Sequence, residues 1–423
     1  MFKFIHAADI HLDSPLTGLQ RYEGAPVDDI RQAARQALQN LVKLASEEEV
    51  AFVLIAGDLY DGDWKDYNTG LFFVKQMAQL READIKVYLV SGNHDAQNKM
   101  TKELPMPDNV RWLSARKSET VLLEQFDVAI HGRSFQKQVV TEDLAATYPV
   151  AVSGAFNVGL LHTCADGREG HERYAPCSLQ KLLSKNYSYW ALGHVHKRET
   201  VCDEPPIWFP GNIQGRHVRE SGAKGCLMVS VGAEGDAHVE FRPLDILRWE
   251  VCEIDISSCD TEDDVLAVLA KRIKELLKSS DDRMLALRFV ITGFSKAHEL
   301  IAARPDHFAN EVRATANNYG RDNIWVEKVV ILICSRAPRS PQGLETESGS
   351  VGELLQLIQE LYDDDAYLLE LSQCLDSLNG ALPVELREGP DTLNLKHPDR
   401  LREILEHAKP MLLNRLLHRV DST

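Results

Sequence analysis

The chain of 423 residues contains 44% hydrophobic and 26% charged residues, as globular proteins do, and its length predicts two or three domains. No stretch has the roughly 20 apolar residues of a membrane-spanning helix, and the apolar start reaches Asp9 too early for a signal peptide, so we expect a cytoplasmic protein without a membrane segment. The net charge of -17 argues against a surface broadly covered with basic residues for nucleic acid, although it leaves room for a local basic patch.

Strand and helix signals alternate in the first 90 residues. Continuous apolar runs predict buried strands, and apolar residues at helical spacing predict amphipathic helices. In chain order we expect a strand over 2–8, a helix over 27–49, a strand over 51–56, a helix over 67–82 and a strand over 85–90. This alternation predicts a parallel sheet.

After residue 120 the expected strands become short and turn residues crowd between them. These strands are expected over 127–130, 156–161, 187–192, 207–209, 226–231 and 238–241. The resulting fold class is α/β, with two sheets packed as a sandwich and flanked by helices rather than one doubly wound sheet.

The pattern changes near residue 246. Strands are expected over 247–256, 284–292 and 324–334, with helices over 263–278 and 307–317 between them. We predict a first domain over 1–245, a small α/β cap over 246–337, a linker rich in Pro and Ser over 338–350 and a helical region over 351–423. Leucine stripes over 351–378 and 400–420 indicate docking to a partner, or packing against the chain's own domains or a second copy.

Five polar clusters follow the apolar runs of the first domain, where α/β folds place their sites. They contain Asp9 and His11, then Asp58, then Asn93, His94 and Asp95, then His162, and finally His194 and His196. One cluster alone would be weak evidence, because a lone His is often a core residue and Gly-Asn-His-Asp is also a turn sequence. Together the five favour a metal site.

The chemistry of these side chains restricts which metal ions can bind. Carboxylate, imidazole and amide donors suit Mn, Fe or Zn ions, whereas the eight cysteines form no C-x-x-C pair and indicate no structural zinc. There are more donors than one metal ion can bind. Sites that hold two metal ions roughly 3.5–4 Å apart recur in phosphate-ester hydrolysis. We therefore expect two divalent ions.

A basic group follows the turn Pro210-Gly211-Asn212, shortly after the last cluster. Its members are Arg216, His217, Arg219 and Lys224. They either bind a phosphate backbone beside the metals or are ordinary surface charges.

With these motifs in order, the chain resembles the calcineurin-like metallophosphoesterases, and within them the DNA-repair exonuclease branch of SbcD-like and YhaO-type proteins. The softer features that indicate the branch are the opening Phe4-Ile5-His6-Ala7-Ala8-Asp9-Ile10-His11-Leu12, the following Asp13-Ser14-Pro15-Leu16, the turn Pro210-Gly211-Asn212-Ile213-Gln214, and the layout of cap and tail. The resemblance implies the metallophosphoesterase sandwich for residues 1–245.

The resemblance also implies roles for the site residues. One ion would be held by Asp9, His11 and His196, and the other by Asn93, His162 and His194, with Asp58 bridging both. His94 would stabilise or protonate the phosphoryl transition state, oriented by Asp95. Manganese is the expected metal, with iron or zinc as alternatives.

The function that follows from the resemblance is a DNA-repair exonuclease of 3' to 5' polarity. The sequence has no Gly-x-x-x-x-Gly-Lys-Ser/Thr motif, so ATP hydrolysis would come from a separate coiled-coil ATPase, SbcC-like or YhaN-like, bound by the C-terminal helices. Homodimerisation is expected by analogy. The alternatives are a phosphodiesterase or phosphatase of a nucleotide or another small molecule, and a non-catalytic scaffold for the ATPase.

Overall fold

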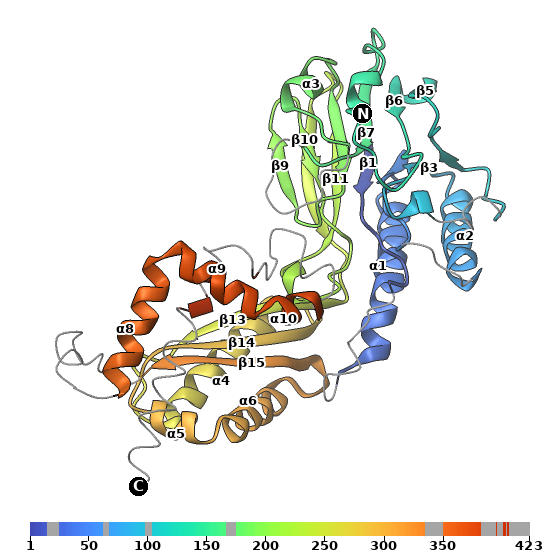
Figure 1. Ribbon diagram of the computed structural model, residues 1–423. Helices are drawn as coiled ribbons and strands as arrows, with labels where there is room; N and C mark the ends of the chain where they lie inside the picture. Colours follow the sequence, from blue (N-terminus) through green and yellow to red (C-terminus); the bar gives the residue numbers. More distant parts are fainter. Residues whose placement is uncertain are drawn as a thin grey trace.

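The computed structural model describes residues 1–14, 25–61, 67–97, 104–165, 175–334 and 350–381, together with residues 395, 401, 402, 404 and 405. Two large sheets form the upper part of the molecule in Figure 1, and a smaller sheet with its own helices forms the lower part. The predicted boundary at residue 245 falls between the last strand of the large sheets and the first strand of the small one.

The first large sheet contains the three parallel strands expected from the first 90 residues and a fourth, short strand that was not predicted. They are β1 (Phe2–Ala7), β2 (Phe52–Ala56), β3 (Lys86–Val90) and the short β4 (Val110–Trp112). Two strands from much later in the chain, β11 (Gly225–Val231) and β12 (Ala237–Pro243), add antiparallel to the other edge of β1. The sheet is therefore mixed, in the order β12-β11-β1-β2-β3-β4.

The second large sheet has the order β5-β6-β7-β8-β10-β9. Its strands are β5 (Glu119–Leu123), β6 (Val128–Gly132), β7 (Phe156–His162), β8 (Tyr189–Gly193), β9 (Glu199–Cys202) and β10 (Ile207–Phe209). Strands β6, β7 and β8 are parallel, so their carboxyl ends lie at one edge of the sheet.

Side-chain alternation along the strands builds the layers. On β1, Ile5 and Ala7 pack under α1 (Val27–Glu47) and α2 (Tyr67–Glu82), whereas Phe4 packs between the two sheets. The outer face of the second sheet is covered by α3 (Leu179–Leu183) and the short helix η5 (Leu144–Thr147). The predicted two-sheet sandwich flanked by helices is confirmed.

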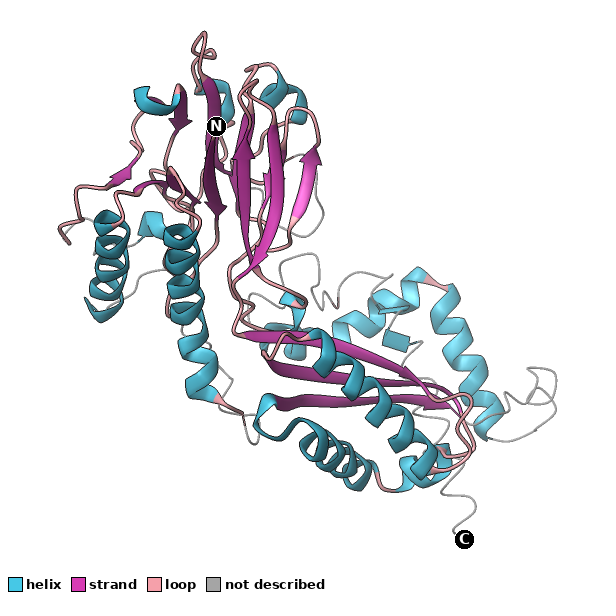
Figure 2. Cartoon of the chain, turned by 180° about the vertical axis from the view of Figure 1, so that it is seen from behind, coloured by secondary structure: helices cyan, strands magenta, loops and turns pink. Residues whose placement is uncertain are grey.

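The small unit contains three parallel strands, β13 (Leu247–Asp255), β14 (Met284–Phe294) and β15 (Ile324–Cys334). Helices α4 (Glu262–Ser279), α5 (His298–Ala303) and α6 (Pro305–Gly320) cover one face through Leu285, Leu287 and Phe289. At one end of the other face, Trp249 and Trp325 pack against Ile30 of α1 and Val218 of the short helix η6 (Val218–Glu220). Figure 2 shows α1 reaching down to this unit, which we call the cap.

The described stretch 350–381 of the C-terminal region is helical, and the leucine stripe over 351–378 is spread over three helices. It is divided into α8 (Ser350–Asp363), α9 (Asp365–Cys374) and α10 (Asp376–Ala381). The first break lies in the Asp363-Asp364-Asp365 run, because aspartate is a poor interior helix residue and a good N-cap. Of the predicted linker over 338–350, only Ser350 is described, and of the leucine stripe over 400–420, only residues 401, 402, 404 and 405.

Candidate metal centre

The seven side chains expected as ligands come together at one end of the two-sheet sandwich. Asp9 and His11 follow β1, Asp58 follows β2 and Asn93 follows β3, while His162 ends β7 and His194 and His196 follow β8. The loop after β1 is joined to the loop after β2 by hydrogen bonds from the Asp9 amide to the Gly57 carbonyl and from the His11 amide to the Asp58 carbonyl, both 3.0 Å. Both sheets therefore contribute donors.

Four of the expected ligands have left-handed backbone conformations that non-glycine residues rarely adopt. The φ angles are 49° at Asp9, 46° at His11, 49° at Asp58 and 106° at His194. Such strain concentrates at functional sites, where the surrounding structure holds it in place.

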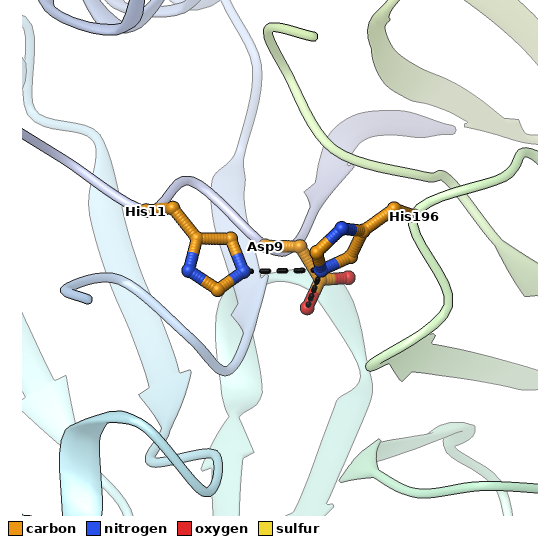
Figure 3. Close-up of side chains that lie close together, drawn as sticks. All are labelled: Asp9, His11 and His196. Carbon is orange, nitrogen blue, oxygen red and sulfur yellow. Dashed lines mark hydrogen bonds and ion pairs between the residues drawn. The ribbon is translucent and has the colours of Figure 1, made fainter. Parts of the chain in front are cut away.

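The first group of donors contains Asp9, His11 and His196, with ligand atoms within 4.8 Å of one another (Figure 3). The Nε2 atoms of His11 and His196 are 3.1 Å apart, and His196 Nε2 lies 4.0 Å from Asp9 Oδ1. Burial and the charge of Arg216 lower the pKa of His11 to about 3, so its imidazole is neutral and can act as a ligand.

The second group contains Asp58, His162 and His194, and Asn93 lies beside it. His162 Nδ1 donates to the Ala56 carbonyl at 2.9 Å, so Nε2 is directed at Asn93 Oδ1, 3.0 Å away, and at Asp58 Oδ2, 3.4 Å away. Burial lowers the pKa of His162, but the charge of Asp58 outweighs this and raises it to about 9. The pocket therefore stabilises a positive charge at this point.

Asp58 lies between the two groups, as a bridging ligand must. Its Oδ2 atom is 3.9 Å from His11 Nε2, while Oδ1 accepts from the His94 amide at 3.0 Å. Burial opposes its ionisation, but His162 and His11 hold the pKa of Asp58 well below its usual range. The donor types and their two-lobed arrangement fit two divalent ions.

Gly92 is required beside these ligands. A Cβ atom at this position would lie 2.2 Å from Asp58 Oδ1 and 2.8 Å from His162 Cε1. Any larger residue would displace a ligand.

His94 lies at the mouth of the centre, and its side chain is 36% exposed. Its orientation does not come from Asp95, contrary to the prediction. Asp61 Oδ1 is 2.9 Å from His94 Nδ1, whereas the Asp95 carboxylate accepts from the amides of Leu59, Tyr60 and Gly92. Asp95 follows His94 in sequence but turns back into the protein, where it holds the loops after β2 and β3 together.

The environment of His94 favours its protonated form. Burial lowers the pKa of His94, but the hydrogen bond to Asp61 and the charge of Asp58 outweigh this and raise it. Asp61 is itself held by Ser14 Oγ at 2.5 Å and lies 3.5 Å from Arg216 Nη1.

The four basic residues predicted to contact substrate have different surroundings. Arg216 lies at the centre, with its Nη2 atom 3.0 Å from Glu220 Oε1, and His217 and Arg219 are exposed on the same loop. Lys224 is only 7% exposed and its Nζ donates to the His196 carbonyl at 2.8 Å. The prediction is therefore wrong for Lys224, whose amine stabilises the loop that carries a ligand.

Glu220 was not among the site residues predicted from the sequence. Its carboxylate lies 2.7 Å from His196 Nδ1. Its position four residues after Arg216, the spacing of a helical ion pair, could have indicated its contact with Arg216. The basic residues around it instead favoured phosphate binding as the interpretation.

The comparisons with known proteins agree with this geometry. Residues 2–198 match the calcineurin-like phosphoesterase family, and residues 249–333 match the middle domain of metallophosphoesterase YhaO. No helix in the described parts of the chain is both long and apolar enough to cross a membrane.

Two curated relatives and one solved structure illustrate the similarity. The chain is 33% identical over 294 residues to the "Uncharacterized metallophosphoesterase YhaO" of Bacillus subtilis, covering 69% of this chain and 71% of that protein. It is 26% identical over 204 residues to the "DNA double-strand break repair protein Mre11" of Methanocaldococcus jannaschii, covering 46% and 51%. A dimetal phosphatase from Danio rerio aligns with 13% identity and a TM-score of 0.36 over 57% of this chain and 96% of that one. The chain belongs to the calcineurin-like metallophosphoesterases, in their YhaO-type branch.

Proposed function

We propose that this metallophosphoesterase is a DNA exonuclease of 3' to 5' polarity that works with a separate coiled-coil ATPase. The observation that carries the hydrolase part is the convergence of Asp9, His11, Asp58, Asn93, His162, His194 and His196 on two adjacent positions. When bound there, two divalent ions, with Mn²⁺ the expected species, supply Lewis acidity and a nucleophile of lowered pKa.

The protein's own residues provide the remaining chemistry. His94 is partly exposed, and Asp61 fixes its Nδ1 atom, so Nε2 is the atom left to face a phosphate ester. Because its pKa is raised, His94 is suited to stabilise charge on the phosphoryl group or to protonate the leaving oxygen. Arg216 adds a fixed positive charge beside this position.

Two observations favour DNA as the substrate. A relative that is 26% identical over 204 residues is named as a DNA double-strand break repair protein, and the centre is joined to a cap that a small-molecule phosphatase does not need. His217 and Arg219 provide exposed basic groups next to the centre.

The test is a nuclease assay on labelled DNA with defined 3' and 5' ends, in Mn²⁺, with cyclic nucleotides and a phosphoprotein as competing substrates. The proposal predicts shortening from the 3' end and loss of activity in the His94→Ala variant. Efficient hydrolysis of a cyclic nucleotide, with no attack on DNA, would assign the centre to small-molecule chemistry instead.

The C-terminal helices are the proposed docking site for the ATPase. Leu357, Tyr367, Leu369 and Leu378 are between 47% and 53% exposed on α8, α9 and α10. Leu368 on α9 instead packs with Leu395 and Leu401, so this helix has an internal face and a free face.

Two partner experiments follow from this arrangement. Deletion of residues 351–423 should abolish co-purification with the ATPase while leaving hydrolysis of a generic diester intact; unchanged co-purification contradicts the docking site. A homodimer remains an expectation by analogy, and sedimentation of the purified chain tests it.

A further inference from the structure

The Glu220 side chain makes four hydrogen bonds. Oε1 lies 2.7 Å from His196 Nδ1 and 3.0 Å from Arg216 Nη2, and Oε2 accepts from Asn212 Nδ2 and from the Arg216 amide, both at 2.8 Å. The Asn212 amide nitrogen, the Arg216 backbone N–H and the Arg216 guanidinium can only donate, so both oxygens of Glu220 act as acceptors.

The Glu220 carboxylate determines how His196 faces the metal position. A carboxylate accepts but does not donate, so His196 Nδ1 carries the proton of this hydrogen bond and Nε2 is left without one. Nε2 is the atom that lies 3.1 Å from His11 Nε2 and 4.0 Å from Asp9. Outer carboxylates of this kind orient histidine ligands and increase their basicity.

The loop that carries Glu220 is held by the cap. The Gln214 side chain bonds both the Ile246 amide and the Leu247 carbonyl, at 2.9 and 2.6 Å, and Trp249 Nε1 donates to the Gly215 carbonyl at 3.1 Å. A Cβ at Gly215 would lie 2.7 Å from the Glu220 carbonyl and 3.0 Å from Trp249 Cδ1, which shows how closely the loop and the cap strand approach.

We propose that Glu220 is a positioning residue of the metal centre, which fixes His196 for the ion shared with Asp9 and His11 and aligns Arg216 beside it. The four hydrogen bonds of Glu220 go to His196, Asn212 and Arg216, whereas His162 of the other ion position bonds the Ala56 carbonyl and lies 3.0 Å from Asn93 Oδ1. Loss of Glu220 should therefore affect the two ions unequally. The inference rests on the proposed two-ion centre but not on DNA as the substrate.

The test is Mn²⁺ binding by calorimetry to the full chain, with Glu220→Ala and Glu220→Gln beside the wild type. We expect Glu220→Ala to reduce the affinity for one Mn²⁺ ion about 10- to 100-fold and to leave the affinity for the other unchanged. Glu220→Gln should lose less, because an amide oxygen still accepts from His196 Nδ1.

A matched control is Glu327→Ala in the cap. Glu327 is also a buried carboxylate paired with an arginine, since its oxygens lie 2.7 and 2.5 Å from Nε and Nη2 of Arg288, but it has no part in the centre. This variant should lose thermal stability and bind both ions normally. Normal binding of both ions by folded Glu220 variants, or equal weakening of both ions, overturns the proposal; if the Ala variant does not fold, the Gln variant decides. Because no substrate is involved, failure of this test is distinct from failure of the nuclease assignment.

Discussion

The contact between His94 and Asp61 allows a quantitative prediction. The two atoms are 2.9 Å apart, and the side chains are 36% and 17% exposed. A hydrogen bond between charged groups contributes about 1.5–3 kcal/mol, equivalent to about 10- to 150-fold in rate, and exposure to solvent moves the expectation to the lower end. Asp61→Asn should therefore reduce kcat about tenfold.

The double variant separates positioning from direct catalysis. Removal of an acid or base group reduces kcat by about 10²- to 10⁴-fold, which is the expectation for His94→Ala. If Asp61 acts through His94, the variant with both changes should be no slower than His94→Ala alone.

The assay is Mn²⁺-dependent hydrolysis of a chromogenic phosphodiester by the four proteins of the cycle. Mn²⁺ binding is measured in parallel, because Asp61 also lies 3.7 Å from His11 Nδ1. If the fold-reductions in kcat of the two single variants multiply in the double variant while metal binding stays intact, the positioning role is refuted and Asp61 has an independent function.

Three further predictions concern the centre and its supports. Gly92→Ala should abolish tight binding of at least one Mn²⁺ in calorimetry, because its Cβ would lie 2.2 Å from Asp58 Oδ1; unchanged binding would show that the loop can move aside. Chelation of the metal should lower the thermal midpoint, since free metal at 100 times its Kd contributes about 2.7 kcal/mol per ion; an identical midpoint with and without EDTA would argue against a bound metal. Burial lowers the pKa of His6 from 6.5 to about 3, so the unfolded chain binds its proton first and stability falls as the pH drops below 6.5, by about 2 kcal/mol at pH 5. His6→Gln should flatten this slope in denaturant titrations at pH 7 and pH 5, and parallel slopes would contradict it.

The candidate ligands could be singled out from the sequence because each lies at or just after the carboxyl end of a buried strand, while their roles came from the family resemblance. Apolar runs such as 52–56 reveal a strand directly, and parallel strands bring their carboxyl ends to one edge. The position of β11 beside β1 was not predictable in this way. That pairing joins residues more than 200 positions apart, and no local pattern encodes a partner at such a distance.

The same limit explains the error at His94. Sequence proximity indicated Asp95, but the positive φ at Asp58 and the short helix that begins at Asp95 turn the loops so that Asp61 faces the imidazole. Glu220 was missed for a related reason, because its role depends on a hydrogen bond to a histidine 24 positions away.

The central place of β1 has a consequence for biosynthesis. Phe2 pairs with Val231, so β1 gains its second neighbour only after roughly 220 more residues have been made, about 10–45 s of synthesis at usual rates. Until then one edge of an apolar strand remains unpaired, which is a known hazard for aggregation. A fragment that stops at residue 198, where the family match ends, would keep this edge open permanently. A recombinant catalytic fragment should therefore extend at least to Pro243, the last residue of β12.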